Sequence, residues 1–211
     1  MMSNWNNIKT YLIQRDPYMR SLIEKYGKPT VLGSPKSNAD LFDSLVRSII
    51  SQQLSVAAAN TISSRVKKTL DIHEFSPLDF LDSSVDSLRG CGLSRSKSRY
   101  IMSLALMVTK NPELLENLRD KNEDLVIKTL LKIKGVGIWT AQMFQIFALK
   151  HLDVFAPSDA GLIKGIRITY LDHKYPNASD LEMISLRWKP YRSIGCWYMW
   201  RVADSKVTLK K

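Results

Sequence analysis

Apolar residues recur along this chain mainly three or four positions apart, and long stretches that alternate between apolar and polar residues are absent. Spacings of three and four follow the 3.6-residue turn of an α-helix, whereas a strand with one buried face needs alternation. The clearest example is the segment 39–70, in which Leu41, Leu45, Ile49 and Ile50 fall on one helical face. This periodicity predicts an all-α protein.

Turn-forming residues divide the predicted helices. Asp40 is the expected cap at the start of the segment 39–70, because its carboxylate can accept from an N–H group of the first turn. Two segments, 88–93 and 133–138, share the order apolar-basic-Gly-X-Gly-apolar, and each precedes a predicted helix. Interruptions are expected at residues 29–35, at residues 51–55, and at Ser76-Pro77, where another short helix begins.

Length and composition limit the class of protein. The 211 residues can bury one core, or two small lobes that share one, and are too few for a machine of many domains. No stretch approaches the roughly 20 apolar residues that a membrane span requires. Residues 1–9 are polar and lack the apolar centre of a secretory signal. We therefore expect a cytoplasmic protein that binds no membrane.

An excess of cationic residues indicates a polyanionic partner. Lysine and arginine total 31 against 20 aspartates and glutamates, which gives a formal net charge of +11. Such a chain gains free energy on nucleic acid because neutralised phosphates release their condensed counterions. The alternative is a basic protein with no nucleic-acid partner. Charge alone does not distinguish these two possibilities, and the sequence motifs described below are needed to do so.

The two cysteines, Cys91 and Cys196, exclude several metal centres. They are too few for a zinc site of four thiolates or for a cysteine-ligated iron–sulfur cluster. We expect free thiols in a reducing compartment.

Residues 130–141 read as a helix, a tight Gly-X-Gly turn and a second helix. Gly135 and Gly137 permit a hairpin that presents the N–H groups of Ile138 and Thr140 at the start of the second helix. These groups and the helix dipole can hold a phosphate without any side chain. Most Gly-X-Gly sequences mark simple turns, so the residues on either side must indicate whether this one binds DNA.

Four segments together resemble one known family. They are residues 130–141, residues 153–162, residues 42–55, and residues 188–193 with 197–201. In their order along the chain, these segments resemble the helix-hairpin-helix (HhH-GPD) superfamily of base-excision DNA glycosylases, most closely the 3-methyladenine DNA glycosylase II branch without its additional N-terminal β-rich domain. The resemblance covers most of the chain from about Phe42 onward.

The resemblance implies one glycosylase unit over residues 1–211, built from two helical lobes with a substrate cleft between them. The expected lobes are residues 35–150, with the hairpin at 130–150, and residues 1–34 together with 151–211. The implied activity is monofunctional hydrolysis of the N-glycosidic bond of alkylated purines, 3-methyladenine and 7-methylguanine, in duplex DNA. The enzyme would flip the base out of the helix and leave an abasic site, as a step of base-excision repair.

Asp159 is the candidate catalytic residue. Its context, Pro157-Ser158-Asp159 before an apolar helical stretch, predicts a helix start, so the carboxylate could simply cap that helix. The same position keeps the carboxylate ionised. By the resemblance, this anion stabilises the positive charge that develops on the deoxyribose.

The superfamily's bifunctional members carry a lysine at the start of the helix after the hairpin, where it forms a Schiff base. Trp139 occupies that position here. Lys132 and Lys134 precede the glycines, and Lys164 follows Asp159. The resemblance therefore predicts a monofunctional enzyme.

The resemblance also assigns a base pocket and a plug. Trp139, Met143 and Trp200 would line the pocket, where aromatic faces attract a cationic alkylated base. Met143 departs from the aromatic residue often found there, which leaves ethenoadenine and hypoxanthine open as further substrates. Gln53 would fill the gap left by the flipped base, with Gln52 and Ser55 bracing the loop; as an alternative, both glutamines cap or link helices. Other aromatic residues are expected to pack the C-terminal helix, namely Trp188, Tyr191, Trp197 and Tyr198.

The resemblance implies no cofactor for catalysis and no iron–sulfur cluster. It implies a structural Na⁺ or K⁺ held in the hairpin by the backbone carbonyls of Leu131, Ile133 and Val136. The expected partner is double-stranded DNA with damaged bases, and we expect a monomer, associated with the nucleoid if the source is prokaryotic. The cations in residues 92–100 either contact phosphates or form a solvated face.

Two alternative functions would explain some of these sequence features. A non-catalytic helix-hairpin-helix DNA-binding protein explains the charge and the hairpin, but not Asp159 or the tryptophans. A bifunctional oxidised-base glycosylase is disfavoured by Trp139 and by the small number of cysteines.

Overall fold

The computed structural model describes residues 4–34 and 37–205, which form helices, turns and loops and contain no strand. The prediction of an all-α protein is thereby confirmed. The first three residues of the polar N-terminus and Pro35 of the expected loop lie outside the described residues. Among the helices that are described, none is both long and apolar enough to cross a membrane.

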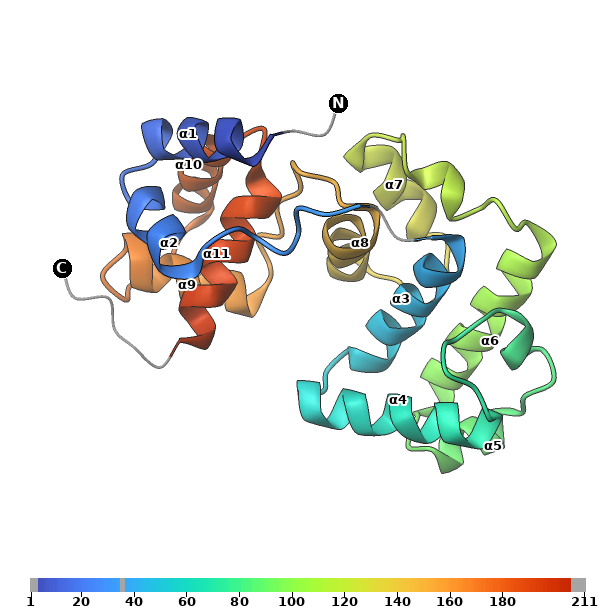
Figure 1. The fold of residues 1–211 in the computed structure, drawn as a ribbon. Coiled ribbons are helices and arrows are strands. Elements are labelled where there is room, and N and C mark those ends of the chain that lie inside the picture. Colours follow the sequence, from blue (N-terminus) through green and yellow to red (C-terminus); the bar gives the residue numbers. More distant parts are fainter. Residues whose placement is uncertain (1–3, 35–36, 206–211) are drawn as a thin grey trace. The chain divides into compact units, whose positions relative to one another are not determined.

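The chain forms two compact units, residues 35–149 and residues 1–34 with 150–211. Figure 1 shows the helices of each unit. The first unit, 35–149, contains α3 (Asn38–Ser51), α4 (Val56–Leu70), η1 (Leu78–Phe80), α5 (Val85–Gly90), α6 (Arg95–Lys110), η2 (Glu116–Leu118), α7 (Glu123–Leu130), α8 (Ile138–Phe144) and the π-helical turn η3 (Gln145–Leu149). The second unit contains α1 (Trp5–Arg15), α2 (Met19–Tyr26), α9 (Ala160–Tyr170), α10 (Ala178–Trp188) and α11 (Arg192–Asp204).

Helix α3 provides one wall of the core of unit 35–149. Leu41, Leu45 and Ile49 are completely buried, as their spacing of four residues predicts, and they pack in one cluster with side chains of α6, α7 and α8. The cap of α3 differs from the expectation. Ser37 is the N-cap and accepts from the Asp40 N–H, while the Asp40 carboxylate accepts from the Ser37 N–H. Asp40 therefore occupies the third helical position of a capping box.

The expected interruptions end helices and start new ones. The break at residues 51–55 is confirmed, because α3 ends at Ser51 and Ser55 caps α4 by accepting from the Ala58 N–H. Both Gly-X-Gly segments lead into helices, since α6 begins at Arg95 and α8 at Ile138.

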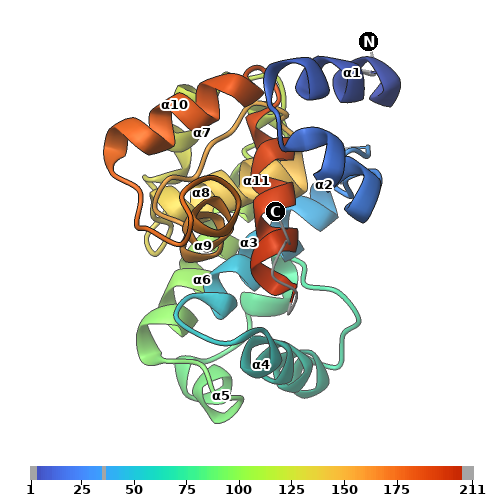
Figure 2. The same cartoon turned by 90° about the vertical axis from the view of Figure 1, so that its left-hand side faces the viewer.

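Two glycines let α11 pack closely against two neighbouring helices of the second unit. A Cβ atom on Gly165 of α9 would overlap the backbone of Met199 in α11, and one on Gly195 of α11 would overlap the ring of Trp188 in α10. Figure 2 gives a second view of α11 beside α2 and α9. This close contact fixes the start of α9 against the side chains of α11.

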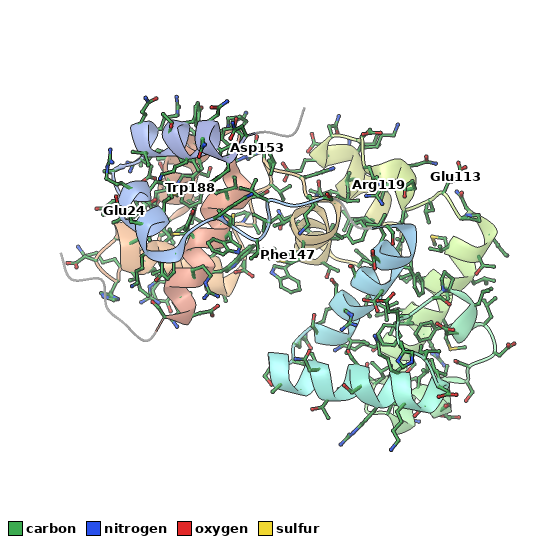
Figure 3. All side chains as sticks on the ribbon, in the orientation of Figure 1. Glu24, Glu113, Arg119, Phe147, Asp153 and Trp188 are labelled. Atoms are coloured by element: carbon green, nitrogen blue, oxygen red, sulfur yellow. The ribbon has the colours of Figure 1, made fainter. Side chains whose placement is uncertain are left out.

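A buried carboxylate joins three elements of the second unit. Asp16 is only 1% exposed, and its oxygens accept from the Tyr18 N–H, the Tyr170 hydroxyl and the Trp188 indole N–H at 2.7–2.9 Å. Burial, and then the nearby Asp16 carboxylate, raise the pKa of Tyr170. Trp188, labelled in Figure 3, is fully buried among the helices of this unit. The network links the α1–α2 turn to α9 and α10.

Candidate functional site

The hairpin between α7 and α8 is held by its own backbone and by two buried side chains. The Ile133 N–H donates to the Leu130 carbonyl, and the Val136 N–H donates to the Ile133 carbonyl, both at 3.0 Å. The side chains of Ile133 and Val136 are buried in the core, which anchors the turn to the unit. The predicted helix–turn–helix is confirmed in this segment.

Gly135 and Gly137 serve the hairpin in different ways. Gly135 has φ +88°, and a Cβ atom there would overlap the Tyr100 ring, so both conformation and packing require glycine. Gly137 is the N-cap of α8 with φ −94°, and a Cβ atom there would meet nothing within 4 Å. The open space at Gly137 would let an external group approach the backbone.

The first turn of α8 offers backbone donors. The N–H groups of a helix's first turn have no acceptor within the helix, and its dipole is positive at that end. The Ile138 side chain is 55% exposed, whereas Thr140 is buried and its hydroxyl accepts from Gln52 at 3.1 Å. A contact from Thr140 to an external anion would therefore use its N–H group rather than its hydroxyl.

The loop between α3 and α4 lies against the hairpin. The Gln52 side chain donates from Nε2 to the Gly135 carbonyl at 2.8 Å as well as to Thr140. Gln52 thus braces the loop, as expected, and it is the residue that ties α3 to the hairpin. Gln53 follows in the left-handed region, with φ +57°, and is exposed.

Trp139 and Met143 lie one turn apart on α8 and share a face. Met143 is only 8% exposed, so most of its surface packs inside the protein, while Trp139 is half-buried. The π-helical turn η3 continues α8 and carries Phe147, which is 41% exposed (Figure 3). A π-turn often accompanies a functional site, and sequence periodicity gave no sign of this one.

Asp159 is the N-cap of α9, which confirms the predicted helix start. Its Oδ1 accepts from the Leu162 N–H at 2.7 Å and from the Trp200 indole N–H at 2.7 Å. Gly161 packs beside this pair, since a Cβ atom there would lie 3.0 Å from the Trp200 ring and 3.2 Å from Asp159 Oδ1. The carboxylate is therefore oriented by α9 and α11 together.

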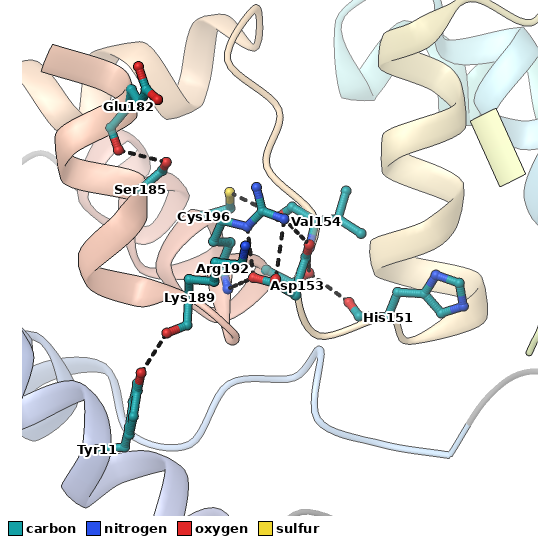
Figure 4. A network of polar contacts seen from close by, with 10 residues as sticks. Tyr11, His151, Asp153, Val154, Glu182, Ser185, Lys189, Arg192 and Cys196 are labelled. Carbon is teal, nitrogen blue, oxygen red and sulfur yellow. Dashed lines mark hydrogen bonds and ion pairs between the residues drawn. The ribbon is translucent and has the colours of Figure 1, made fainter. Parts of the chain in front are cut away.

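The loop that leads to Asp159 is attached to the start of α11 (Figure 4). Arg192 donates to the Asp153 carboxylate at 2.7 Å and to the Asp153 carbonyl at 2.8 Å. The Ser193 hydroxyl donates to the His151 carbonyl and accepts from the Val154 N–H at 3.0 Å. Residues 153–154 and 192–193 lie in segments that carried the family resemblance, but no sequence pattern revealed that these two segments bond to each other.

The remaining aromatic residues near the C-terminus largely serve packing, as expected. The Trp197 indole donates to the Thr30 hydroxyl at 3.0 Å, and the Tyr198 hydroxyl donates to the Gly27 carbonyl at 2.7 Å. Both contacts attach α11 to the segment after α2. Burial raises the pKa of Tyr198 well above its usual value. Trp200 is the exception, because its indole bonds to Asp159.

The candidate residues form two groups, one in each unit. Unit 35–149 holds the phosphate-binding and plug candidates together with Trp139 and Met143, and Gln52 bonds directly to two hairpin residues. The other unit holds Asp159 and Trp200, bonded to each other. The fold and these residues define a helix-hairpin-helix protein with an oriented carboxylate at a helix N-terminus.

Comparison with known proteins identifies the family. The family model described as HhH-GPD superfamily base excision DNA repair protein matches residues 46–190. The chain therefore belongs to this superfamily. It is 30% identical to the alkylbase DNA glycosidase-like protein mag2 of Schizosaccharomyces pombe, over 95% of this chain and 94% of the relative.

Solved structures agree with this assignment. A DNA-3-methyladenine glycosidase from Bacillus halodurans matches with a TM-score of 0.80 and 31% identity, over 94% of this chain and 89% of that chain. The 3-methyladenine DNA glycosylase Mag1 of S. pombe, in complex with abasic DNA, matches with a TM-score of 0.77 and 26% identity, over 97% and 100%.

Proposed function

We propose that this protein is a monofunctional DNA glycosylase that hydrolyses the N-glycosidic bond of alkylated purines in duplex DNA and leaves an abasic site. The single observation that carries the proposal is the Asp159 carboxylate, fixed at the N-terminus of α9 by the Leu162 N–H and the Trp200 indole. The names of the relatives support the same chemistry, since three of them are DNA-3-methyladenine glycosylases from yeasts and from Bacillus subtilis.

Asp159 supplies the negative charge that the reaction needs. As the bond between base and sugar breaks, positive charge develops on the deoxyribose, and a fixed carboxylate stabilises this transition state more than the ground state. The alkylated base already carries a positive charge and is a good leaving group. Trp200 holds the carboxylate in one orientation, so no reorganisation is needed during the reaction.

The hairpin and the α3–α4 loop bind the DNA in this proposal. The N–H groups of Ile138 and Thr140 receive a phosphate, and the open space at Gly137 allows its close approach. Gln53, which is exposed beside the hairpin-bound Gln52, enters the duplex where the damaged base has left. Gln53 thereby compensates part of the unstacking cost.

Trp139 and Met143 in one unit, and Trp200 in the other, are each proposed to contact the damaged base. The Trp139 ring attracts a cationic purine by cation–π contact, while Met143 contributes through the small part of its surface that is exposed. Trp200 has a second function here, because its N–H group is bonded to Asp159 while its ring remains partly exposed. Methylated purines are the proposed substrates.

No lysine takes the place of a Schiff-base nucleophile in this proposal. Trp139 stands where the bifunctional enzymes carry theirs, and the Lys164 ammonium donates to the Ala203 carbonyl at 2.6 Å. Water is therefore the proposed nucleophile, and strand cleavage does not follow base release.

The proposal includes a monovalent cation in the turn of the hairpin. Residues 131–137 contain no carboxylate, so a metal there would be bound by neutral carbonyls, and the Ile133 carbonyl, although it accepts from the Val136 N–H, keeps a second lone pair. We propose that the carbonyls of Leu131, Ile133 and Val136 hold Na⁺ or K⁺, which would add positive charge beside the phosphate. The protein would act as a monomer in the cytoplasm, on chromosomal DNA.

The test is incubation of the protein with methylated duplex DNA and measurement of the released bases. We expect release of 3-methyladenine and 7-methylguanine, with abasic sites in equal number and no strand breaks. DNA binding without base release would favour the non-catalytic protein. A covalent adduct trapped with borohydride would favour the bifunctional enzyme.

A further inference from the structure

The C-terminus of α3 is completed by a side chain from another helix. A helix leaves its last carbonyl groups without intrahelical donors, and a glycine in the left-handed conformation commonly provides the turn that satisfies them. Here α3 ends at Ser51, and Gln53, not a glycine, adopts the left-handed conformation with φ +57°. A hydrogen-bond donor from another helix can therefore stabilise the last carbonyl groups of α3.

Lys97 of α6 supplies that donor. Its ammonium donates to the Ile50 carbonyl at 2.8 Å and to the Gln52 carbonyl at 2.7 Å. The Lys97 side chain is partly buried, whereas the neighbouring Arg95 and Arg99 are exposed. Partial burial lowers the pKa of Lys97, because removal of water disfavours the charged form of its amine.

Gln52 connects this lysine to the hairpin. Its carbonyl is held by Lys97, and its side chain donates to the Gly135 carbonyl and the Thr140 hydroxyl. The residue before Gln53 is therefore fixed through both its backbone and its side chain. Gln53 itself stays exposed at the end of this arrangement.

We propose that Lys97 is a positioning residue, which holds the loop 52–55 against the hairpin so that Gln53 is ready to enter the duplex. The proposal rests on the proposed function, in which Gln53 fills the gap left by the flipped base. A loop that is ordered before binding does not lose that conformational entropy on the DNA, which strengthens binding where the plug is used.

The rival interpretation is that Lys97 contacts a DNA phosphate, as the basic stretch 92–100 would also allow. The two differ in what they predict for DNA without a lesion. A phosphate contact contributes to binding of any duplex and to its salt dependence. A positioning residue affects the duplex in which a gap is available for Gln53.

The experiment measures the dissociation constants of wild type, Lys97→Met, Lys97→Arg and Arg99→Met for two duplexes, one with a tetrahydrofuran abasic analogue and one undamaged. For K97M we expect affinity for the abasic duplex to fall by about tenfold or more, as for loss of a charged hydrogen bond. Affinity for the undamaged duplex and the salt slope should stay at wild-type values. K97R, which keeps the donors and the charge, should recover part of the loss.

Arg99→Met is the matched control, because it removes one positive charge from the same helix without touching the loop. It should change the affinity for both duplexes by the same factor. If K97M behaves like R99M, or leaves the preference for the abasic duplex intact, the positioning role is wrong. Gln52→Ala removes the side-chain bonds from the loop to the hairpin, and it should lower the affinity for the abasic duplex more than the affinity for the undamaged duplex. This variant covers the case in which K97M does not fold.

A double variant identifies the residue through which Lys97 acts. In a Gln53→Ala background, K97M should cause little further loss, because the plug is already absent; full additivity would contradict the proposal. Measurements on the wild-type protein distinguish a failure of the positioning role from a failure of the proposed function. If wild type prefers the abasic duplex and K97M keeps that preference, only the positioning role fails. If wild type shows no preference and releases no base, the proposed function fails, and the positioning role fails with it.

Discussion

At the scale of single residues, the pair Asp159–Trp200 combines two functions that sequence alone could not separate. Asp159 is the N-cap of α9 and accepts from the Leu162 N–H group, so it stabilises the start of this helix. The same Oδ1 atom accepts from the Trp200 indole, which places an aromatic ring and the proposed catalytic anion in direct contact. In the proposed mechanism, Trp200 acts on the reaction through Asp159 as well as through its ring.

Trp200→Phe tests this coupling. Phenylalanine keeps an aromatic face but cannot donate a hydrogen bond, so the carboxylate loses the donor that α11 supplies. We expect kcat for base release to fall by about tenfold to a hundredfold, as for a hydrogen bond to a charged group. Single-turnover rates on methylated DNA give the value, and the midpoint of thermal unfolding should change little. An unchanged rate would show that the indole N–H has no part in catalysis.

The position of Asp159 was predictable, and its partner was not. The order Pro-Ser-Asp before an apolar helical stretch is a local signal for a helix start, and α9 begins where that signal places it. The bond from Trp200 depends on the packing of α9 against α11, which Gly165 permits by leaving room for the Met199 backbone. No sequence pattern specifies that contact.

At the scale of elements, the two glycines of the hairpin differ in how strictly the fold requires them. Gly135 is required by its positive φ and by the Tyr100 ring, while Gly137 has ordinary backbone angles and open space around its Cα. The sequence predicted both glycines in one role. The structure requires a glycine at position 135 but not at position 137, where we propose that the open space admits a DNA phosphate.

The matched variants Gly135→Ala and Gly137→Ala distinguish these duties. G135A should lower the free energy of unfolding by about 2 kcal/mol or more, from backbone strain and overlap with Tyr100. G137A should change stability by less than about 1 kcal/mol, yet weaken binding to undamaged and abasic duplexes alike, because a methyl group enters the path of the phosphate. Denaturant unfolding and DNA titration of both proteins give the comparison. Equal stability losses would contradict the assignment.

Element boundaries were predicted where local chemistry decides them. The break between α3 and α4 follows from polar residues 51–55, but the cap of α3 was assigned to Asp40, and Ser37 holds it. A serine three residues before an acidic residue forms a capping box, and the reciprocal bonds show the acidic residue to be the inner partner. The π-turn at Gln145–Leu149 was missed because its residues are as apolar as those of the helix it continues.

At the scale of the whole molecule, each unit depends on contacts between segments far apart in sequence. Asp16 is the clearest case, since one carboxylate accepts from Tyr18, Tyr170 and Trp188 and is almost completely buried. No pattern in the sequence distinguishes Asp16 from the other aspartates and glutamates, which total 20 with it. Periodicity predicts which face of a helix is buried, but not which polar residue is enclosed when helices meet.

Asp16→Ala should lower the free energy of unfolding by about 3 kcal/mol or more, because it leaves two or three buried donors without an acceptor. Asp204→Ala removes an exposed carboxylate at the end of α11 and should change stability by less than about 0.5 kcal/mol. Urea titrations of both variants check the difference. A loss for D16A no larger than that for D204A would mean that the network contributes little.

The rate of base release by Asp159→Asn tests the catalytic role of the Asp159 carboxylate most directly. Asparagine caps helices about as well as aspartate, so α9 should keep its N-terminus and the protein its thermal midpoint, while the charge beside the sugar is lost. We expect the single-turnover rate of 3-methyladenine release from methylated duplex DNA to fall by about a hundredfold or more. A folded D159N protein that releases the base at nearly the wild-type rate would contradict the central claim.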